Sequence, residues 1–131
     1  MSNIRVLLAD DHRAVLEQVC KILSDDFEIV GKVNNGRDAI REAERLDPDV
    51  VVLDISMPVL NGLQAAQRLQ AANLRAKVIF LTVHEDKDFV AAAFYAGASG
   101  YVTKADVDTD LIPAIQDVLE GRVYVSKSIT P

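Results

Sequence analysis

The stretch that decides the fold is VVVLDISMPVLNG, residues 50–62. Its first four residues, Val50–Leu53, are all apolar, as in a short strand buried on both faces at the centre of a parallel sheet. Asp54 follows this run directly, and the segment after it contains Pro58 and an Asn-Gly pair, which indicate a loop. The sequence therefore predicts a carboxylate at the carboxyl edge of a central strand.

Three other apolar runs are followed by polar side chains in the same way. These polar residues are Asp10 and Asp11 after residues 4–9, Thr82 after residues 77–81, and Lys104 after residues 100–103. In an open parallel sheet the carboxyl ends of the strands border the crevice where ligands bind. Three carboxylates, a hydroxyl and an ammonium at that edge suit a Mg²⁺ ion and a phosphoryl group, with Asp54 as the acceptor.

Segments of helical periodicity alternate with the apolar runs along the whole chain. Strands are expected at 4–9, 27–33, 50–53, 77–81 and 101–102, and helices at about 13–24, in a dozen residues before Pro48, and around 63–69, 89–97 and 111–119. Five successive strand-helix units imply an α/β fold, a doubly wound parallel sheet with helices on both faces. Pro113 conflicts with a helix that begins near Asp106, so we expect a start near Thr109 or Asp110, with a kinked helix as the alternative.

Composition narrows the classes of function. The chain has 131 residues, of which 50% are hydrophobic and 26% charged, as expected for one globular domain. Its net charge of −6 argues against nonspecific nucleic-acid binding by this segment. No signal peptide or membrane-length apolar run is visible, so a cytoplasmic location without membrane association is expected. Cys20 is the single cysteine and lies on an apolar helix face, which favours a small buried hydrophobe over a reactive thiol.

The combination of site residues resembles the receiver domain of bacterial two-component response regulators, over about residues 3–121. The segments LLADDH, DISMPVLNGL, LTVHED, AGASGYVTK and GRVYVS resemble, more narrowly, the receivers of NarL/LuxR-type transcription regulators. The resemblance implies a flavodoxin-like (CheY-like) sheet of five parallel strands, in the order 2-1-3-4-5, with five helices. Residues 1–121 would then form the receiver domain, and residues 122–131 a C-terminal tail or the start of a linker.

The resemblance also implies roles for individual residues. Asp54 is expected to be phosphorylated, with Thr82 and Lys104 as the other catalytic groups that contact the phosphoryl oxygens. Thr82 and Tyr101 would form the switch, because Tyr101 can rotate into the space that Thr82 vacates. The alternatives are a capping hydroxyl for Thr82, a surface ammonium for Lys104 and a half-buried strand aromatic for Tyr101.

The metal expected at this site is Mg²⁺ (or Mn²⁺). By resemblance, Asp11 and Asp54 are direct ligands, Asp10 acts through water, and Ser56 contributes its backbone carbonyl. Because three neighbouring carboxylates repel one another, at least one pKa should rise without metal, and metal binding should stabilise the fold.

Four positions bear on how this chain differs from the commonest receiver pattern. Val83 stands where Ala or Ser is frequent and could narrow access to the phosphoryl group. Ser56 and His84 occupy positions that tune phosphoryl lifetime in the family, so an altered lifetime is expected. Ala105 replaces a frequent proline after Lys104, and a trans peptide bond is expected there.

The leading hypothesis is a phosphoacceptor switch that receives its phosphoryl group from a histidine kinase. Such a protein catalyses only its own phosphorylation and dephosphorylation, so we do not expect an enzyme acting on external substrates. The kinase should dock around the first helix, near Arg13, Val15 and Gln18, and a homodimer is possible. Transcription would be regulated through a helix-turn-helix domain that this chain lacks, and DNA would be bound only through that domain.

Four alternatives compete with this hypothesis. The chain could be a stand-alone receiver, or a pseudo-receiver that is never phosphorylated and serves as a protein-interaction module. An aspartate-nucleophile phosphohydrolase is disfavoured, since Ser56 stands where such enzymes need a second carboxylate. A dinucleotide-binding domain is disfavoured by the acidic turn at Asp10-Asp11, where a Gly-rich phosphate loop would be required.

Overall fold

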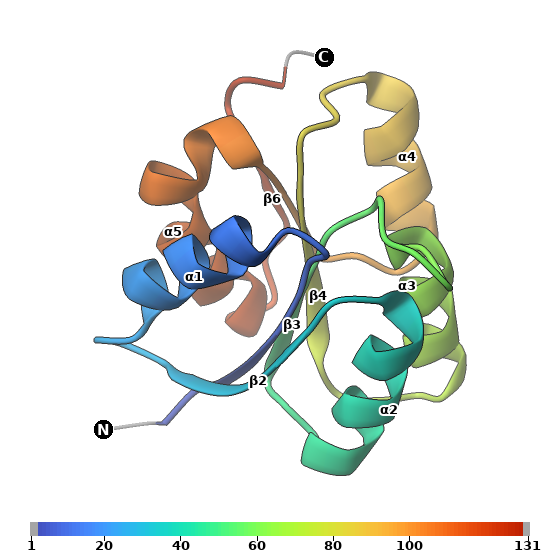
Figure 1. The fold of residues 1–131 in the computed structure, drawn as a ribbon. Helices are drawn as coiled ribbons and strands as arrows, with labels where there is room; N and C mark the ends of the chain where they lie inside the picture. The colour runs from blue at the N-terminus through green and yellow to red at the C-terminus, as the bar shows by residue number, and fades with distance from the viewer. Residues whose placement is uncertain (1–2, 130–131) are drawn as a thin grey trace.

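A computed structural model of the chain describes residues 3–129 as a parallel sheet with helices on both faces (Figure 1). The strands are β1 (Arg5–Ala9), β2 (Glu28–Val33), β3 (Val50–Leu53), β4 (Lys77–Thr82), β5 (Gly100–Thr103) and β6 (Tyr124–Val125). The helices are α1 (Arg13–Leu23), α2 (Gly36–Leu46), α3 (Gly62–Ala71), α4 (Lys87–Tyr95) and α5 (Val107–Leu119), with a 3₁₀ turn η1 (Lys104–Asp106). The strand order is β2-β1-β3-β4-β5-β6, which confirms the predicted 2-1-3-4-5 order and adds a sixth strand.

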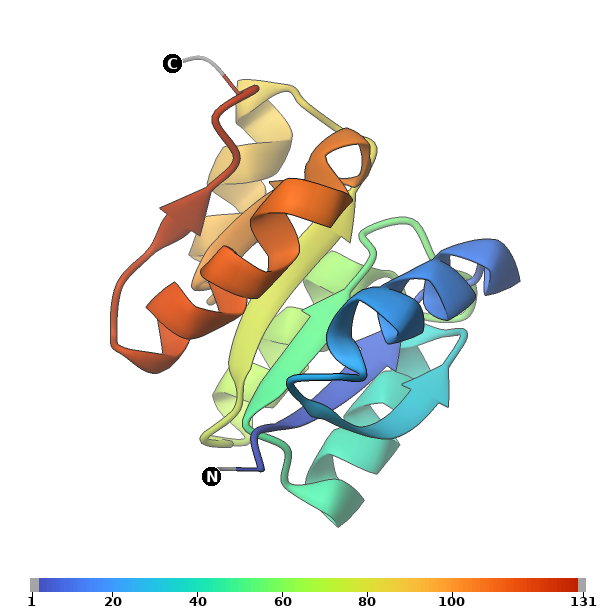
Figure 2. The same ribbon diagram turned by 90° about the vertical axis from the view of Figure 1, so that its left-hand side faces the viewer.

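Two apolar layers hold the helices to the sheet. Helices α1 and α5 cover one face, where Val19 and Leu111 pack among residues such as Val52 (Figure 1). Figure 2 looks onto this face and shows both helices in front of the sheet. Helices α2, α3 and α4 cover the other face, on which Ala43 and Leu69 belong to a second core. This is the doubly wound arrangement that the sequence predicts.

Strand β3 lies at the centre of the sheet, between β1 and β4. All four of its residues are buried, as a continuous apolar run requires when both faces are covered. The register pairs Leu53 with Ala9 on one side and with Phe80 on the other. The residues that follow these strands therefore emerge side by side at one edge of the sheet.

The turn after β3 depends on a glycine. A side chain at Gly62 would place its Cβ 2.0 Å from the backbone oxygen of Asp54, so only glycine fits this position. Asn61 then caps α3: its side chain accepts a hydrogen bond from the Gln64 backbone amide, and its own backbone amide donates one to the Gln64 side chain. The Asn-Gly pair thus fixes how α3 leaves the loop that follows Asp54.

The predicted late start of α5 is wrong. The helix begins at Val107, directly after the η1 turn, and Pro113 lies in its interior. Val107 and Leu111 are buried against the sheet, and this packing favours the longer helix over one that spares the proline. Pro113 lacks the N–H that would bond the carbonyl of Thr109, but both residues are exposed, so water can hydrate that carbonyl.

The predicted tail is partly built into the fold. Residues 130 and 131, and residues 1 and 2 at the other end, lie outside the described part of the chain. Gly121, with a φ of 85°, follows α5, and residues 124–125 then pair with β5 as strand β6.

Within residues 3–129 the Lys104–Ala105 peptide bond is trans, as expected. No helix in the same range is long and apolar enough to cross a membrane.

Candidate functional site

The carboxyl edge of the sheet brings the predicted acidic and basic side chains together. Asp10 and Asp54 follow β1 and β3, and each is only 3% exposed. The Lys104 ammonium reaches both from the end of β5, with Nζ 2.8 Å from Asp10 Oδ2 and 3.3 Å from Asp54 Oδ2. Asp11 is exposed at the rim of the same cluster. The alternative of a solvated surface ammonium for Lys104 is therefore wrong.

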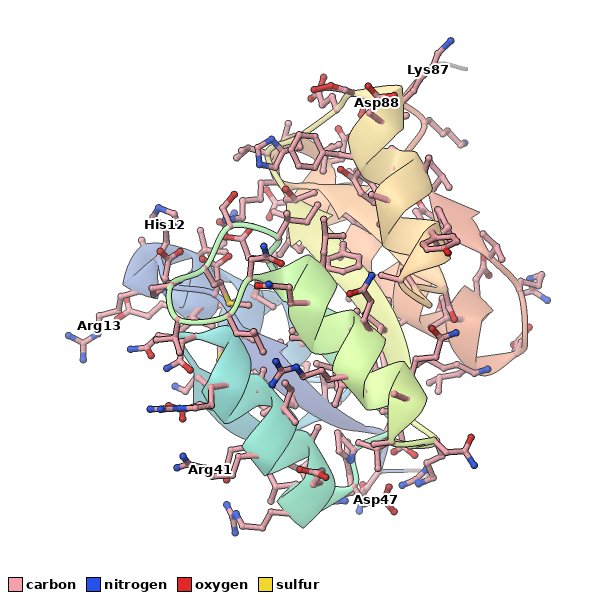
Figure 3. All side chains as sticks on the ribbon, turned by 90° about the vertical axis from the view of Figure 1, so that its right-hand side faces the viewer. His12, Arg13, Arg41, Asp47, Lys87 and Asp88 are labelled. Carbon is pink, nitrogen blue, oxygen red and sulfur yellow. The ribbon has the colours of Figure 1, made fainter. Side chains whose placement is uncertain are left out.

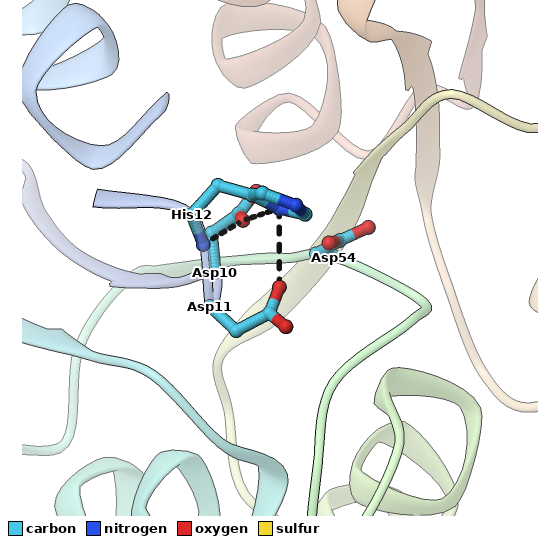
Figure 4. Close-up of side chains that lie close together, drawn as sticks. All are labelled: Asp10, Asp11, His12 and Asp54. Atoms are coloured by element: carbon cyan, nitrogen blue, oxygen red, sulfur yellow. Dashed lines mark hydrogen bonds and ion pairs between the residues drawn. The ribbon is translucent and has the colours of Figure 1, made fainter. Parts of the chain in front are cut away.

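His12 joins this cluster, a role that was not predicted from the sequence. Its Nδ1 lies 3.2 Å from Asp10 Oδ1 and 3.1 Å from Asp11 Oδ1 (Figure 4). Its backbone amide donates to Asp10 Oδ1 at 2.8 Å, and the residue precedes the first turn of α1. Figure 3 shows His12 beside Arg13, at the start of α1 and far from Asp47. Its position directly after the acidic pair was the signal available in the sequence.

The pKa shifts in the cluster arise because the buried carboxylates of Asp10 and Asp54 share a single ammonium, that of Lys104. Burial, and then the charge of Asp10, raises the pKa of Asp54 above its ordinary value, against the opposing effect of Lys104. For Lys104, burial lowers the pKa, but contacts with Asp10 and Asp54 outweigh it and the net shift is upward. Lys104 thus stays protonated but does not fully neutralise the buried acidic pair.

The donor set fits a divalent cation. Asp10, Asp11, His12 and Asp54 each offer a ligand atom, and these atoms lie within 4.8 Å of one another. Asp10 Oδ2 is buried and accepts no well-directed hydrogen bond, its one close partner being the Lys104 ammonium. Carboxylate oxygens are what Mg²⁺ and Mn²⁺ prefer, and a cation would relieve the repulsion that raises the pKa of Asp54.

The hydroxyl and the aromatic side chain predicted for the switch meet at the loop after β4. Thr82 is fully buried, and its Oγ1 accepts a hydrogen bond from the His84 amide at 3.2 Å. Tyr101 is also fully buried, and its hydroxyl donates to the His84 carbonyl at 2.8 Å. Burial, followed by the charges of Asp86 and Glu85, raises the pKa of Tyr101 to about 12. The phenol therefore remains a donor throughout the neutral range, and the side chain is fully buried where the alternative expected it to be half-buried.

Of the three residues expected to tune the phosphoryl lifetime, Ser56 and His84 contact each other and Val83 points away. Ser56 Oγ and His84 Nε2 share a hydrogen bond at 3.1 Å that joins the loops after β3 and β4. The His84 ring also stacks on Phe89 of α4, with centroids 4.0 Å apart, a contact that was not predicted from the sequence. Val83 points outward and is 67% exposed. Ser56 also makes a backbone hydrogen bond to the Asp54 carboxylate, which places its main chain beside the acidic cluster.

A doubly wound sheet with an acidic cluster and a lysine at its carboxyl edge defines the class of the protein. The chain belongs to the response regulator receiver domain family, whose pattern it matches over residues 6–116.

Individual relatives agree with this assignment. The chain is 36% identical to the response regulator GacA of Pseudomonas viridiflava over 128 residues, covering 96% of this chain and 60% of GacA. It is 35% identical to the transcriptional regulatory protein DegU of Brevibacillus brevis, covering 98% of this chain and 56% of DegU. A LuxR-family two-component response regulator from Aurantimonas sp. SI85-9A1 superposes with a TM-score of 0.92 at 32% identity, covering 98% of this chain and 93% of that one. The chain thus spans only about three fifths of these curated relatives.

Proposed function

We propose that this receiver domain is a phosphoacceptor switch, phosphorylated on Asp54 by a histidine kinase with the help of Mg²⁺ or Mn²⁺. The observation that carries the proposal is the buried Asp54 carboxylate, with Lys104 Nζ 3.3 Å away and Asp10 beside it. An acidic nucleophile in this setting has both a cationic partner for a phosphoryl oxygen and carboxylates for a metal.

The chemistry assigns one task to each side chain. An oxygen of Asp54 attacks phosphorus, and the bond between phosphorus and the donor atom breaks, leaving the electron pair on the donor. A divalent cation held by Asp10, Asp11, Asp54 and the Ser56 carbonyl would supply positive charge beside the phosphoryl oxygens. Lys104 exchanges its carboxylate contacts for a phosphoryl oxygen, and the Thr82 hydroxyl donates to another.

The same contacts support a switch. The Thr82 hydroxyl accepts from the His84 amide, and the Tyr101 hydroxyl donates to the His84 carbonyl. If Thr82 turns toward a phosphoryl group on Asp54, it gives up the contact with His84, and the loop that Tyr101 holds must adjust. We describe the response as a population shift between two arrangements of this loop and of β5.

The proposal includes no reaction on external substrates. Ser56 is two residues after Asp54, where a phosphohydrolase of this kind would need an acid or base, and its hydroxyl is engaged with His84. Only phosphorylation of Asp54 and loss of that group to water are proposed.

The biological setting is proposed from the relatives. Because DegU is a transcriptional regulatory protein and the matched relatives are longer, we propose that transcription is regulated through a DNA-binding domain outside these residues. Arg13, Val15 and Gln18 lie on α1, the helix that follows His12, and are the proposed docking surface for the kinase. By family membership the protein would act in the cytoplasm, and a homodimer is compatible with this role.

The proposal is tested with a small-molecule phosphodonor. The protein is incubated with acetyl phosphate and Mg²⁺, and intact mass is followed with time beside Asp54→Asn and beside a sample containing a chelator. One added phosphoryl group on the wild type, and none on the variant or without metal, is the expected result. An unmodified wild type that also fails to bind beryllofluoride would instead favour an interaction module.

A further inference from the structure

The segment after α5 is bonded to the strand that carries the switch residue and the lysine. The amide of Tyr124 donates to the Ser99 carbonyl at 3.1 Å, and the amide of Ser126 donates to the Tyr101 carbonyl at 2.9 Å. These bonds make β6 the neighbour of β5 at the edge of the sheet (Figure 2). We call residues 122–129 the tail. Because its backbone completes one side of β5, any movement of β5 must be shared by the tail.

Four polar side chains then join the tail to the junction between β5 and α5. The Ser126 hydroxyl accepts from the Thr103 amide at 3.1 Å, and Ser126 and Thr103 are both fully buried. The Asp106 carboxylate accepts from Ser128 at 2.6 Å and from the Thr103 hydroxyl at 2.9 Å. The hydroxyls of Thr103 and Ser128 are themselves 3.3 Å apart. We refer to Thr103, Asp106, Ser126 and Ser128 as the latch.

Two residues of the latch flank Lys104, the lysine of the candidate site, along the chain. Thr103 immediately precedes Lys104, and Asp106 ends the η1 turn that begins at Lys104. Lys104 therefore lies between two residues, Thr103 and Asp106, that are hydrogen-bonded to the tail. Its side chain points the other way, to Asp10 and Asp54. The bonds from Ser128 and Thr103 also lower the pKa of Asp106, so this carboxylate is charged and a strong acceptor at neutral pH.

We infer that Asp106 is a positioning residue for Lys104, and that it acts through its hydrogen bonds with the hydroxyls of Thr103 and of Ser128 on the tail. Attraction of Lys104 by a phosphoryl group requires a fixed η1 turn, and the latch fixes it. By reciprocity, occupation of Asp54 must change the stability of the latch by the same coupling free energy. The tail is then part of the phosphoacceptor machinery as well as a connection to whatever follows it.

This inference rests on the proposed phosphorylation of Asp54, so the wild type is measured first. Phosphorylation by acetyl phosphate with Mg²⁺ is followed by intact mass for Asp106→Asn, Ser128→Ala and the conservative Ser128→Thr. Ser24→Ala, an exposed serine after α1, is the matched control. Chemical unfolding of each variant shows that it is folded under the conditions used.

Allosteric couplings are commonly worth at least about a fivefold change in a binding equilibrium, and we take the same scale for the stabilisation that a positioned Lys104 gives to phosphoryl transfer. We expect Asp106→Asn and Ser128→Ala to be phosphorylated at least about fivefold more slowly, with Ser128→Thr and Ser24→Ala close to wild type. Amide exchange at Ser126 should slow when beryllofluoride and Mg²⁺ occupy the wild-type site, but not in Asp106→Asn.

The two proposals fail in different ways. A wild type that never takes a phosphoryl group contradicts the proposed function. A wild type that is phosphorylated while folded Asp106→Asn and Ser128→Ala match its rate overturns the latch alone. The latch is equally overturned if Ser128→Thr is as slow as Ser128→Ala, because the hydroxyl would then not be the group that matters.

Discussion

Ser56 Oγ lies 3.1 Å from His84 Nε2, and this hydrogen bond joins the loop that follows β3 to the loop that follows β4. Each residue stands two positions after a buried site residue, Asp54 in one loop and Thr82 in the other. The His84 ring is held from behind by its stack on Phe89. The bridge therefore ties the loop after β3 to α4.

Loss of this bridge should shorten the life of a phosphoryl group on Asp54. A hydrogen bond of this kind contributes about 0.5–1.5 kcal/mol, which corresponds to at most about a tenfold change in rate. We expect Ser56→Ala to dephosphorylate roughly three- to tenfold faster, because attacking water meets a looser pair of loops. Decay of the phosphorylated mass after removal of the donor gives the rate.

Two further variants make this measurement specific. Ser56→Thr keeps a hydroxyl and should decay like wild type, so equally fast decay of the Thr and Ala variants would contradict the bridge. Val83→Ala tests the separate idea that this side chain limits access. Val83 is 67% exposed, and a decay rate equal to wild type would remove it from the residues that set the lifetime.

The hydroxyl of Tyr101 should contribute to stability through the loop it holds. Tyr101→Phe leaves the buried ring in place but removes the donor to the His84 carbonyl. We expect the free energy of unfolding to fall by about 1 kcal/mol, the usual cost of one lost hydrogen bond. Urea unfolding measures it. Tyr95→Phe, at an 86% exposed position, is the control, and an equal loss in both variants would contradict a special role for the Tyr101 hydroxyl.

The parts of the fold predicted from sequence are those in which local pattern and burial agree. The apolar run Val50–Leu53 predicted a central strand, and the structure has the strand at those residues. The convergence of Asp10, Asp54 and Lys104 followed from the rule that parallel strands end at one edge.

The parts that sequence did not predict depend on distant partners. The two residues of β6 are too few to show periodicity, and they become a strand only because β5 offers an unpaired edge. Pro113 by itself favours a helix that starts later, but the burial of Val107 stabilises the longer helix. The stack of His84 on Phe89 depends on the direction in which α4 leaves the preceding loop, and the spacing of residues in the sequence does not predict that direction.

Val59 should be a site where a substitution stabilises the protein. It has a φ of 68°, in the left-handed region that β-branched residues avoid, and it is 70% exposed. This conformation costs an L residue roughly 1–2 kcal/mol, and asparagine tolerates it far better. Val59→Asn should therefore raise the free energy of unfolding by about 1 kcal/mol. Val123→Asn, also exposed but without a positive φ, is the control, and an equal gain there would point to polarity instead of backbone strain.

The acidic cluster should make the metal-free protein less stable as pH rises from acid to neutral. The folded-state pKa of Asp54 lies above its ordinary 3.8, so its contribution to stability is present below that value and is lost as pH rises through the folded pKa. Asp54→Asn removes this penalty, and Lys104 keeps its contact with Asp10. The variant should exceed wild type by on the order of 1 kcal/mol near neutral pH, by less in acid, and by less when Mg²⁺ is added.

Urea unfolding over this pH range, with and without Mg²⁺, measures the difference between wild type and Asp54→Asn. Asp25→Asn, in an exposed loop after α1, shows how much any loss of one negative charge contributes in a chain of net charge −6. A gain for Asp54→Asn that is no larger than for Asp25→Asn, or that does not change with pH, would contradict repulsion within the cluster. A gain confined to the Asp54 variant, and reduced by Mg²⁺, would tie the buried charge of Asp54 directly to the cation site, because only a metal bound among these carboxylates relieves the same repulsion.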